Sequence, residues 1–220
     1  MALIKGTESI RETARRHLDR LGNLVFSHRI GVSRACMVVF FIVFLMTESA
    51  YGDSLFACLL FLLGTVLVGV ATVGRLWCAV YISGYKDCEL VTAGPYSISR
   101  NPLYFFSLLG FAGVGFATET LTLGLALVAV YLLCCPSVIR REESSLRERF
   151  GSRYENYCAR TPQFFPNLAA LSEPATYRVK PKPFRRTLGD VVWFVWLIGL
   201  IQLVDELHEV HLIKALFQLH

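Results

Sequence analysis

The chain has 220 residues, of which 54% are hydrophobic and only 18% charged, and its mean hydropathy is +0.49. Soluble domains carry about 25% charged residues, so this composition excludes an ordinary soluble domain and indicates an integral membrane protein. The net charge of +5 does not favour nucleic acid as a partner. The basic residues flank apolar runs, so a membrane surface is the better match.

The first 34 residues are basic, and residues 5–29 have the pattern of an amphipathic helix lying on a membrane. Charge-free apolar windows follow. We predict five of them to be transmembrane helices: 35–47, 54–74, 101–118, 120–139 and 191–204. A span needs at least about 17 residues, so the first and last windows require flanking charges that reach back to the interface. The second helix is expected to continue past the bilayer through Arg75 and Trp77.

The basic residues give the orientation. In the five-helix arrangement, 21 of the 22 Lys and Arg residues fall on one side, and only Lys214 falls on the other. The positive-inside rule places that side, together with the N-terminus, in the cytoplasm. A tight hairpin at 117–120 joins the third and fourth helices. The predicted division is a cytoplasmic segment 1–34, a membrane core 35–171, a proline-containing linker 172–187, and a further transmembrane helix with its tail, 188–220.

Two polar stretches lie at the cytoplasmic ends of these helices. In GPYSISRNPLYF, residues 94–105, Asn101 and Pro102 are typical of a helix start, with Asn as the cap and Pro in the first turn. RREESSL, residues 140–146, has the pattern of an interfacial amphipathic helix. Each stretch alone has this structural explanation. Because the hairpin makes the two helices neighbours, their tyrosines, arginines and carboxylates are expected to converge on one pocket that attracts a cationic cofactor.

Three other features are interpreted as structural. The seven cysteines contain no C-x-x-C pair and mostly lie in or beside apolar runs, which predicts free thiols. Gly113 and Gly115 are expected to allow close helix packing. His208 and His211 are interpreted as polar groups at the end of the last helix, and no metal site is predicted.

A set of motifs in fixed order resembles the isoprenylcysteine carboxyl methyltransferase family and its phospholipid methyltransferase relatives. The motifs are VGRLWCAVYISGYKDCELVTAGPY, GPYSISRNPLY, RREESSL and FGSRYENYCARTPQFFP, and the resemblance covers residues 60–167. It implies an all-α integral membrane bundle of about five transmembrane helices with a cytoplasmic pocket for S-adenosyl-L-methionine. The implied activity is methyl transfer to a lipophilic substrate from the bilayer, with membrane lipids as further partners. No oligomeric state is predicted.

The resemblance also implies site residues. Those implied to bind the cofactor are Leu90, Val91, Gly94, Tyr96, Asn101, Pro102, Tyr104 and Glu142. Catalytic roles are predicted for Arg100 or Arg140, either of which could orient a substrate carboxylate, and for Glu143, which with Glu142 is a candidate base for a thiol or amine. The family's usual histidine is Asn101 here. Asparagine keeps the hydrogen bonding but cannot titrate near neutral pH.

Two alternative functions stay open. Sterol and steroid reductases that bind NADPH have similar R-x-P-x-Y and F-G-x-x-Y-x-x-Y stretches, although their chains usually carry more spans. A non-enzymatic membrane scaffold that kept the fold would be compatible with Asn101 and with the additional last helix. For the methyltransferase, the acceptor is open among a prenylated cysteine, a lipid amine and a hydrophobic thiol.

Overall fold

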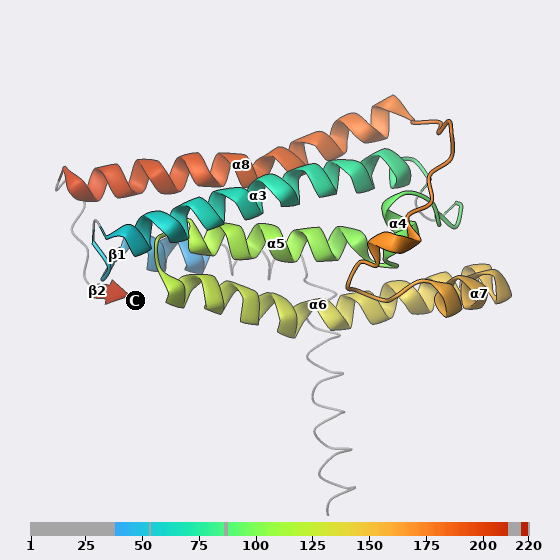
Figure 1. The fold of residues 1–220 in the computed structure, drawn as a ribbon, viewed down its shortest axis with the longest axis horizontal. Coiled ribbons are helices and arrows are strands. Elements are labelled where there is room, and N and C mark those ends of the chain that lie inside the picture. Colours follow the sequence, from blue (N-terminus) through green and yellow to red (C-terminus); the bar gives the residue numbers. More distant parts are fainter. Residues whose placement is uncertain (1–37, 53, 86–87, 211–216, 220) are drawn as a thin grey trace, which may run out of the picture.

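The computed structural model describes residues 38–52, 54–85, 88–210 and 217–219 (Figure 1). The predicted helix 5–29, the beginning of the first window and His211 lie outside these residues. Residues 38–45 are helical, and the remaining elements are β1 (Thr47–Ser49), α3 (Leu55–Ile82), α4 (Pro95–Ile98), α5 (Pro102–Phe116), α6 (Leu121–Phe150), α7 (Ser152–Arg160), the 3-10 turn η1 (Leu168–Ala170), α8 (Pro181–Glu209) and β2 (Phe217–Leu219). The predicted helical bundle is confirmed. The short strands β1 and β2, which pair in parallel, were not predicted.

Among the described residues, three helices have the length and composition to cross a membrane: α3, α6 and α8. Their outer surfaces are strongly apolar, with Leu133 81% and Trp196 72% exposed. Large exposed apolar surfaces of this kind mark contact with lipid or a partner. The third predicted span corresponds to α5, which has only 15 residues. At 1.5 Å per residue it is about 22 Å long, shorter than the hydrocarbon core of about 30 Å.

Helix α5 lies between α3 and α6, and α8 packs along α3 (Figure 1). Glycines permit the close approach of these helices. A Cβ atom on Gly113 would lie 2.6 Å from the carbonyl oxygen of Gly64, and one on Gly115 would lie 2.6 Å from Cα of Gly124. The predicted packing role of Gly113 and Gly115 is therefore confirmed. The hairpin at 117–120 is also found, and the Thr118 hydroxyl closes it by donating to the carbonyl oxygen of Gly115 at 2.7 Å.

Two boundaries differ from the sequence prediction. The fourth span and RREESSL form one continuous helix, α6, rather than a transmembrane helix followed by a separate interfacial one. Helix α8 begins at Pro181, inside the segment predicted as a linker. Pro181 and Pro183 suggested an irregular segment, but proline is well tolerated in the first turn of a helix, where its missing N–H has no partner to lose.

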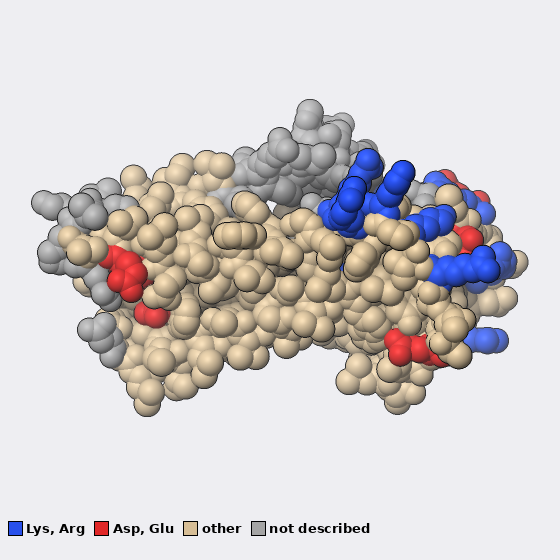
Figure 2. Space-filling model, turned by 90° about the horizontal axis from the view of Figure 1, so that it is seen from above, with Lys and Arg blue, Asp and Glu red and all other residues tan. Residues whose placement is uncertain are grey.

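Charge is distributed along the long axis of the molecule. Figure 2 shows Lys and Arg gathered toward the end that carries α4 and α7, whereas Asp and Glu occur at both ends and the middle is uncharged. The predicted membrane orientation was derived from this one-sided distribution of Lys and Arg. The assignment of the basic end to the cytoplasm stays a prediction. At the opposite end, the buried His208 places Nε2 3.2 Å from the Leu45 carbonyl oxygen, as expected for a structural polar group. The six cysteines described are free thiols.

Candidate active site

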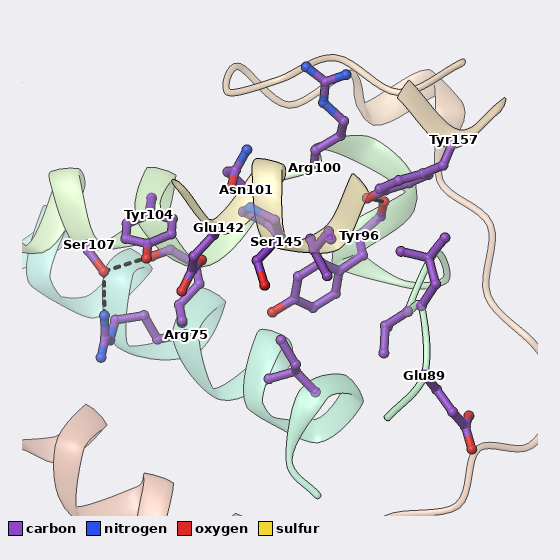
Figure 3. A pocket seen from close by; sticks show the side chains of 16 residues that line it. Arg75, Glu89, Tyr96, Arg100, Asn101, Tyr104, Ser107, Glu142, Ser145 and Tyr157 are labelled. Carbon is purple, nitrogen blue, oxygen red and sulfur yellow. Dashed lines mark hydrogen bonds between the residues drawn. The ribbon is translucent and has the colours of Figure 1, made fainter. Parts of the chain in front are cut away.

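A pocket of about 290 Å³ lies at the basic end, where α3, α4, α5 and α6 meet (Figure 3). Its volume is just below the roughly 300–1,000 Å³ typical of small-molecule sites. Its walls combine apolar, aromatic and charged side chains: Arg75, Ile82, Glu89, Leu90, Val91, Tyr96, Arg100, Asn101, Pro102, Leu103, Tyr104, Ser107, Glu142, Ser145, Leu146 and Tyr157. The two polar stretches singled out from the sequence therefore do meet at one site.

A turn at Gly94 sets the direction of α4. Gly94 has a φ of +60°, which favours glycine, and a Cβ there would collide with the ring of Tyr81. Residues 161–180, here called the strap, cross over this turn. The Gly94 N–H donates to the Ser172 carbonyl at 2.8 Å, and the Asn167 N–H donates to the Ile98 carbonyl at 2.8 Å. The strap thereby fixes both ends of α4 and with them the position of Tyr96.

A polar junction, made by the buried Asn101 and Glu143 together with Arg100 and Gln163, joins the start of α5 to α6. The Asn101 side-chain amide donates to Oε1 of Glu143 at 3.0 Å and to the Gln163 carbonyl at 3.0 Å. Oε1 of Glu143 also lies 3.2 Å from Nε of Arg100, and its Oε2 accepts from Nε2 of Gln163 at 3.0 Å. The helix starts at Pro102 as predicted, but the side-chain cap predicted for Asn101 is wrong. Its amide holds the junction instead.

The predicted site residues fall into two groups. Those that line the pocket are Leu90, Val91, Tyr96, Arg100, Asn101, Pro102, Tyr104 and Glu142. The others, Gly94, Arg140 and Glu143, are not among its lining residues. Gly94 supports α4 through its backbone, Glu143 is buried in the junction, and Arg140 is exposed on α6. Arg100 lines the pocket, but its guanidinium extends away from Tyr96 and Glu142 (Figure 3). The chemical roles of all these residues stay predictions.

Sequence reasoning missed Arg75 as a pocket residue. It was interpreted as a charge beyond the membrane, yet its guanidinium donates to the Ser107 hydroxyl on α5 and lies 5.4 Å from the centroid of the Phe194 ring. The available signal was its place within a long apolar helix, where ionisable residues commonly mark functional sites. Tyr157, one of the tyrosines expected to converge on the pocket, was given no role in the site, and it does line the pocket. Its hydroxyl donates to the Tyr96 carbonyl oxygen at 2.6 Å.

The Tyr96 hydroxyl is the unusual group of the pocket. Tyr96 is only 7% exposed, and its hydroxyl points into the pocket without a hydrogen-bond partner among the described residues (Figure 3). Burial raises the pKa of this phenol well above its ordinary value, so the hydroxyl stays protonated and able to donate. A buried unpaired hydroxyl is costly. A ligand that accepts this hydrogen bond would remove that cost.

The residues present fit the cofactor that the motifs imply. The pocket presents the Glu142 carboxylate and the rings of Tyr96, Tyr104 and Tyr157, groups that attract an organic cation. Tyr96 adds a hydrogen-bond donor. Within the described residues, by contrast, no group of three or more His, Cys, Asp or Glu side chains is arranged to hold a metal ion.

Together, these features define a helical membrane protein with a small-molecule pocket at its basic end. The sequence model of the phospholipid methyltransferase family matches residues 53–153, which include most of the pocket. The chain belongs to this family, which is part of the isoprenylcysteine carboxyl methyltransferase-like group, as its motifs predicted.

Two curated relatives cover most of the chain. It is 42% identical over 175 residues to the nickel-cobalt-cadmium resistance protein NccN of Alcaligenes xylosoxydans xylosoxydans, covering 80% of this chain and 82% of that one. It is also 42% identical over 175 residues to the cobalt-zinc-cadmium resistance protein CzcN of Cupriavidus metallidurans, covering 80% and 81%. No solved structure matches the chain significantly.

Proposed function

We propose that this protein is an S-adenosyl-L-methionine-dependent methyltransferase that acts on a lipophilic substrate, with its N-terminus and active site on the cytoplasmic side of a membrane. The observation that carries the proposal is the unpaired, buried Tyr96 hydroxyl in a pocket that also presents Glu142. Membership of a methyltransferase family supports it and favours methyl transfer over the NADPH reductase alternative. When bound, the cofactor would supply an activated methyl group on a sulfonium.

Each pocket residue would have a distinct role in binding and methyl transfer. Glu142 and the tyrosine rings would attract the sulfonium, and the Tyr96 hydroxyl would donate a hydrogen bond that fixes the bound molecule. The Asn101 amide binds Glu143 and thereby holds the start of α5 against α6. At the position where the family usually has histidine, this chain would therefore use a residue that positions the wall of the pocket. A carboxylate acceptor needs no base, whereas a thiol or amine would lose its proton to Glu142. Exclusion of water and alignment would supply the remaining rate enhancement.

Calorimetric titration of the purified protein in detergent and in lipid nanodiscs tests cofactor binding. We expect S-adenosylmethionine and its demethylated product to bind with dissociation constants between about 1 µM and 1 mM. NADPH is the control and is expected not to bind. A protein that ignores both adenosyl ligands would be the scaffold of the alternative hypothesis. Mass spectrometry of lipids after incubation with a methyl-labelled cofactor then identifies the acceptor.

We further propose that this activity contributes to tolerance of divalent metal ions, because two relatives that cover most of the chain are named for such resistance. A metal-sensitive bacterium expressing the chain is expected to tolerate more cobalt, nickel or cadmium than one expressing the Glu142→Gln variant at equal protein level. Growth at increasing metal concentration measures this. Equal metal tolerance of the two strains would contradict the proposal that methyl transfer contributes to resistance.

A further inference from the structure

A second pocket, of about 590 Å³, adjoins the first. The two are neighbours because Leu90 and Tyr157 line both. One wall of the second pocket is a face of α7 that carries Arg153, Asn156, Tyr157 and Arg160, residues that recur every three or four positions. The lining also includes Ser97 of α4 and Ser172 of the strap, which are joined by a 2.9 Å hydrogen bond from the Ser172 N–H to the Ser97 hydroxyl.

The charge of the second pocket is one-sided. Arg153 and Arg160 are its only charged lining residues, and all the others are neutral. In the part of the chain that the structure describes, neither guanidinium forms an ion pair. The acidic residue of α7, Glu155, is engaged elsewhere, because it pairs with Arg147 of α6 at 2.6 Å. Two guanidinium groups beside an uncharged, hydrogen-bonding wall are suited to an oxyanion, above all a carboxylate or phosphate.

The first pocket has the acidic groups that the second lacks. Its lining includes Glu89 and Glu142 as well as Arg75, Arg100 and three tyrosine rings, and the Arg100 guanidinium and the Glu89 carboxylate both extend away from Tyr96 (Figure 3). The pocket is small for a complete adenosyl cofactor. S-adenosylmethionine carries a sulfonium and an α-carboxylate joined by a short carbon chain. A ligand with its cationic sulfur in the first pocket could therefore extend its carboxylate past Tyr157 into the second.

We infer that the second pocket is the carboxylate subsite of the cofactor, with Arg153 and Arg160 as the residues that bind the anion. This inference rests on the proposed function and adds to it the residues that bind the α-carboxylate of the cofactor's methionine part. Both arginines lie on α7, a helix whose FGSRYENYCAR sequence matched the family motif without any of its residues being assigned a role.

The test compares S-adenosylmethionine with decarboxylated S-adenosylmethionine, which keeps the sulfonium and lacks the carboxylate. The wild-type protein is expected to bind the complete ligand at least about tenfold more tightly, as for a charge-assisted hydrogen bond. In the Arg153→Gln/Arg160→Gln double variant this preference should fall to about twofold or less, while affinity for the decarboxylated ligand should be kept or increased. That retained affinity also verifies that the variant is folded. Calorimetry in nanodiscs measures all four dissociation constants.

The matched control is Arg185→Gln/Arg186→Gln, which removes two exposed arginines of α8 that line neither pocket. It should keep the wild-type preference, which excludes an effect of net charge alone. If the double variant on α7 retains the full preference, or if the wild type shows none while still binding both ligands, the subsite is refuted and the proposed function stands. If the wild type binds neither ligand, both fail.

Discussion

Replacing Glu143 with alanine is expected to lower the free energy of unfolding by about 3 kcal/mol, the lower end of the range for breaking a buried ion pair. The side chain is 12% exposed and its partner Arg100 15%. The variant would leave Arg100, the Asn101 amide and the Gln163 amide without their common acceptor. Unfolding in a mixed-detergent titration, followed by circular dichroism, measures the effect.

Two further variants serve as comparisons for Glu143→Ala. Arg140→Ala removes an exposed charge from the same helix and should change the unfolding free energy by less than about 0.5 kcal/mol. Glu143→Gln keeps an oxygen for Asn101 but loses the ion pair, so its loss should be intermediate. If Glu143→Ala were as stable as Arg140→Ala, the junction would not hold α5 against α6.

Replacing Glu142 with glutamine is expected to weaken binding of S-adenosylmethionine by at least about tenfold, because the nearly isosteric change removes the negative charge that faces the pocket. Binding of a neutral analogue with carbon in place of the sulfonium should change much less. Titration of both ligands against the wild type and the variant gives the comparison. The difference between the two ligands identifies the role of charge.

Glu148→Gln is the control for this second prediction. Glu148 is an exposed residue of α6 that does not line the pocket, so its replacement should leave both affinities unchanged. The unfolding titration is repeated on Glu142→Gln to show that the fold is retained. A scaffold would be indifferent to either change, and equal affinities across the three proteins would contradict the cofactor pocket.

The sequence allowed the bundle and the meeting of the two motifs to be predicted because both depend on short-range patterns. Charge-free windows located α3, α5 and α6, and the four-residue hairpin between α5 and α6 required the polar ends of these two helices to be neighbours. The contacts of Asn101 could not be predicted in the same way. Its capping propensity is local, whereas its actual partners, Glu143 and the Gln163 carbonyl, are distant in sequence. The Asn101 side chain therefore binds these distant partners and does not cap α5.

The same reason explains what was missed at the site. Arg75 has an interfacial position by hydropathy, and only the packing of α3 on α5 brings it to Ser107 and the pocket. Tyr96 was assigned from the motif, but its unpaired hydroxyl depends on the turn at Gly94 and on the strap that fixes α4. Neither feature has a periodic sequence signature.

The shortness of α5 has a consequence for how an acceptor would reach the pocket. A 15-residue helix held between neighbours of 28 and 30 residues creates a hydrophobic mismatch on one side of the bundle. Local thinning of the bilayer is one way in which such a mismatch is accommodated. Thinning at the N-terminal end of α5 would bring headgroups toward Asn101 and Pro102, which line the pocket. The deformed leaflet would then lead a lipid to the reacting centre by diffusion in two dimensions, and the acceptor's chain would stay dissolved in the membrane throughout.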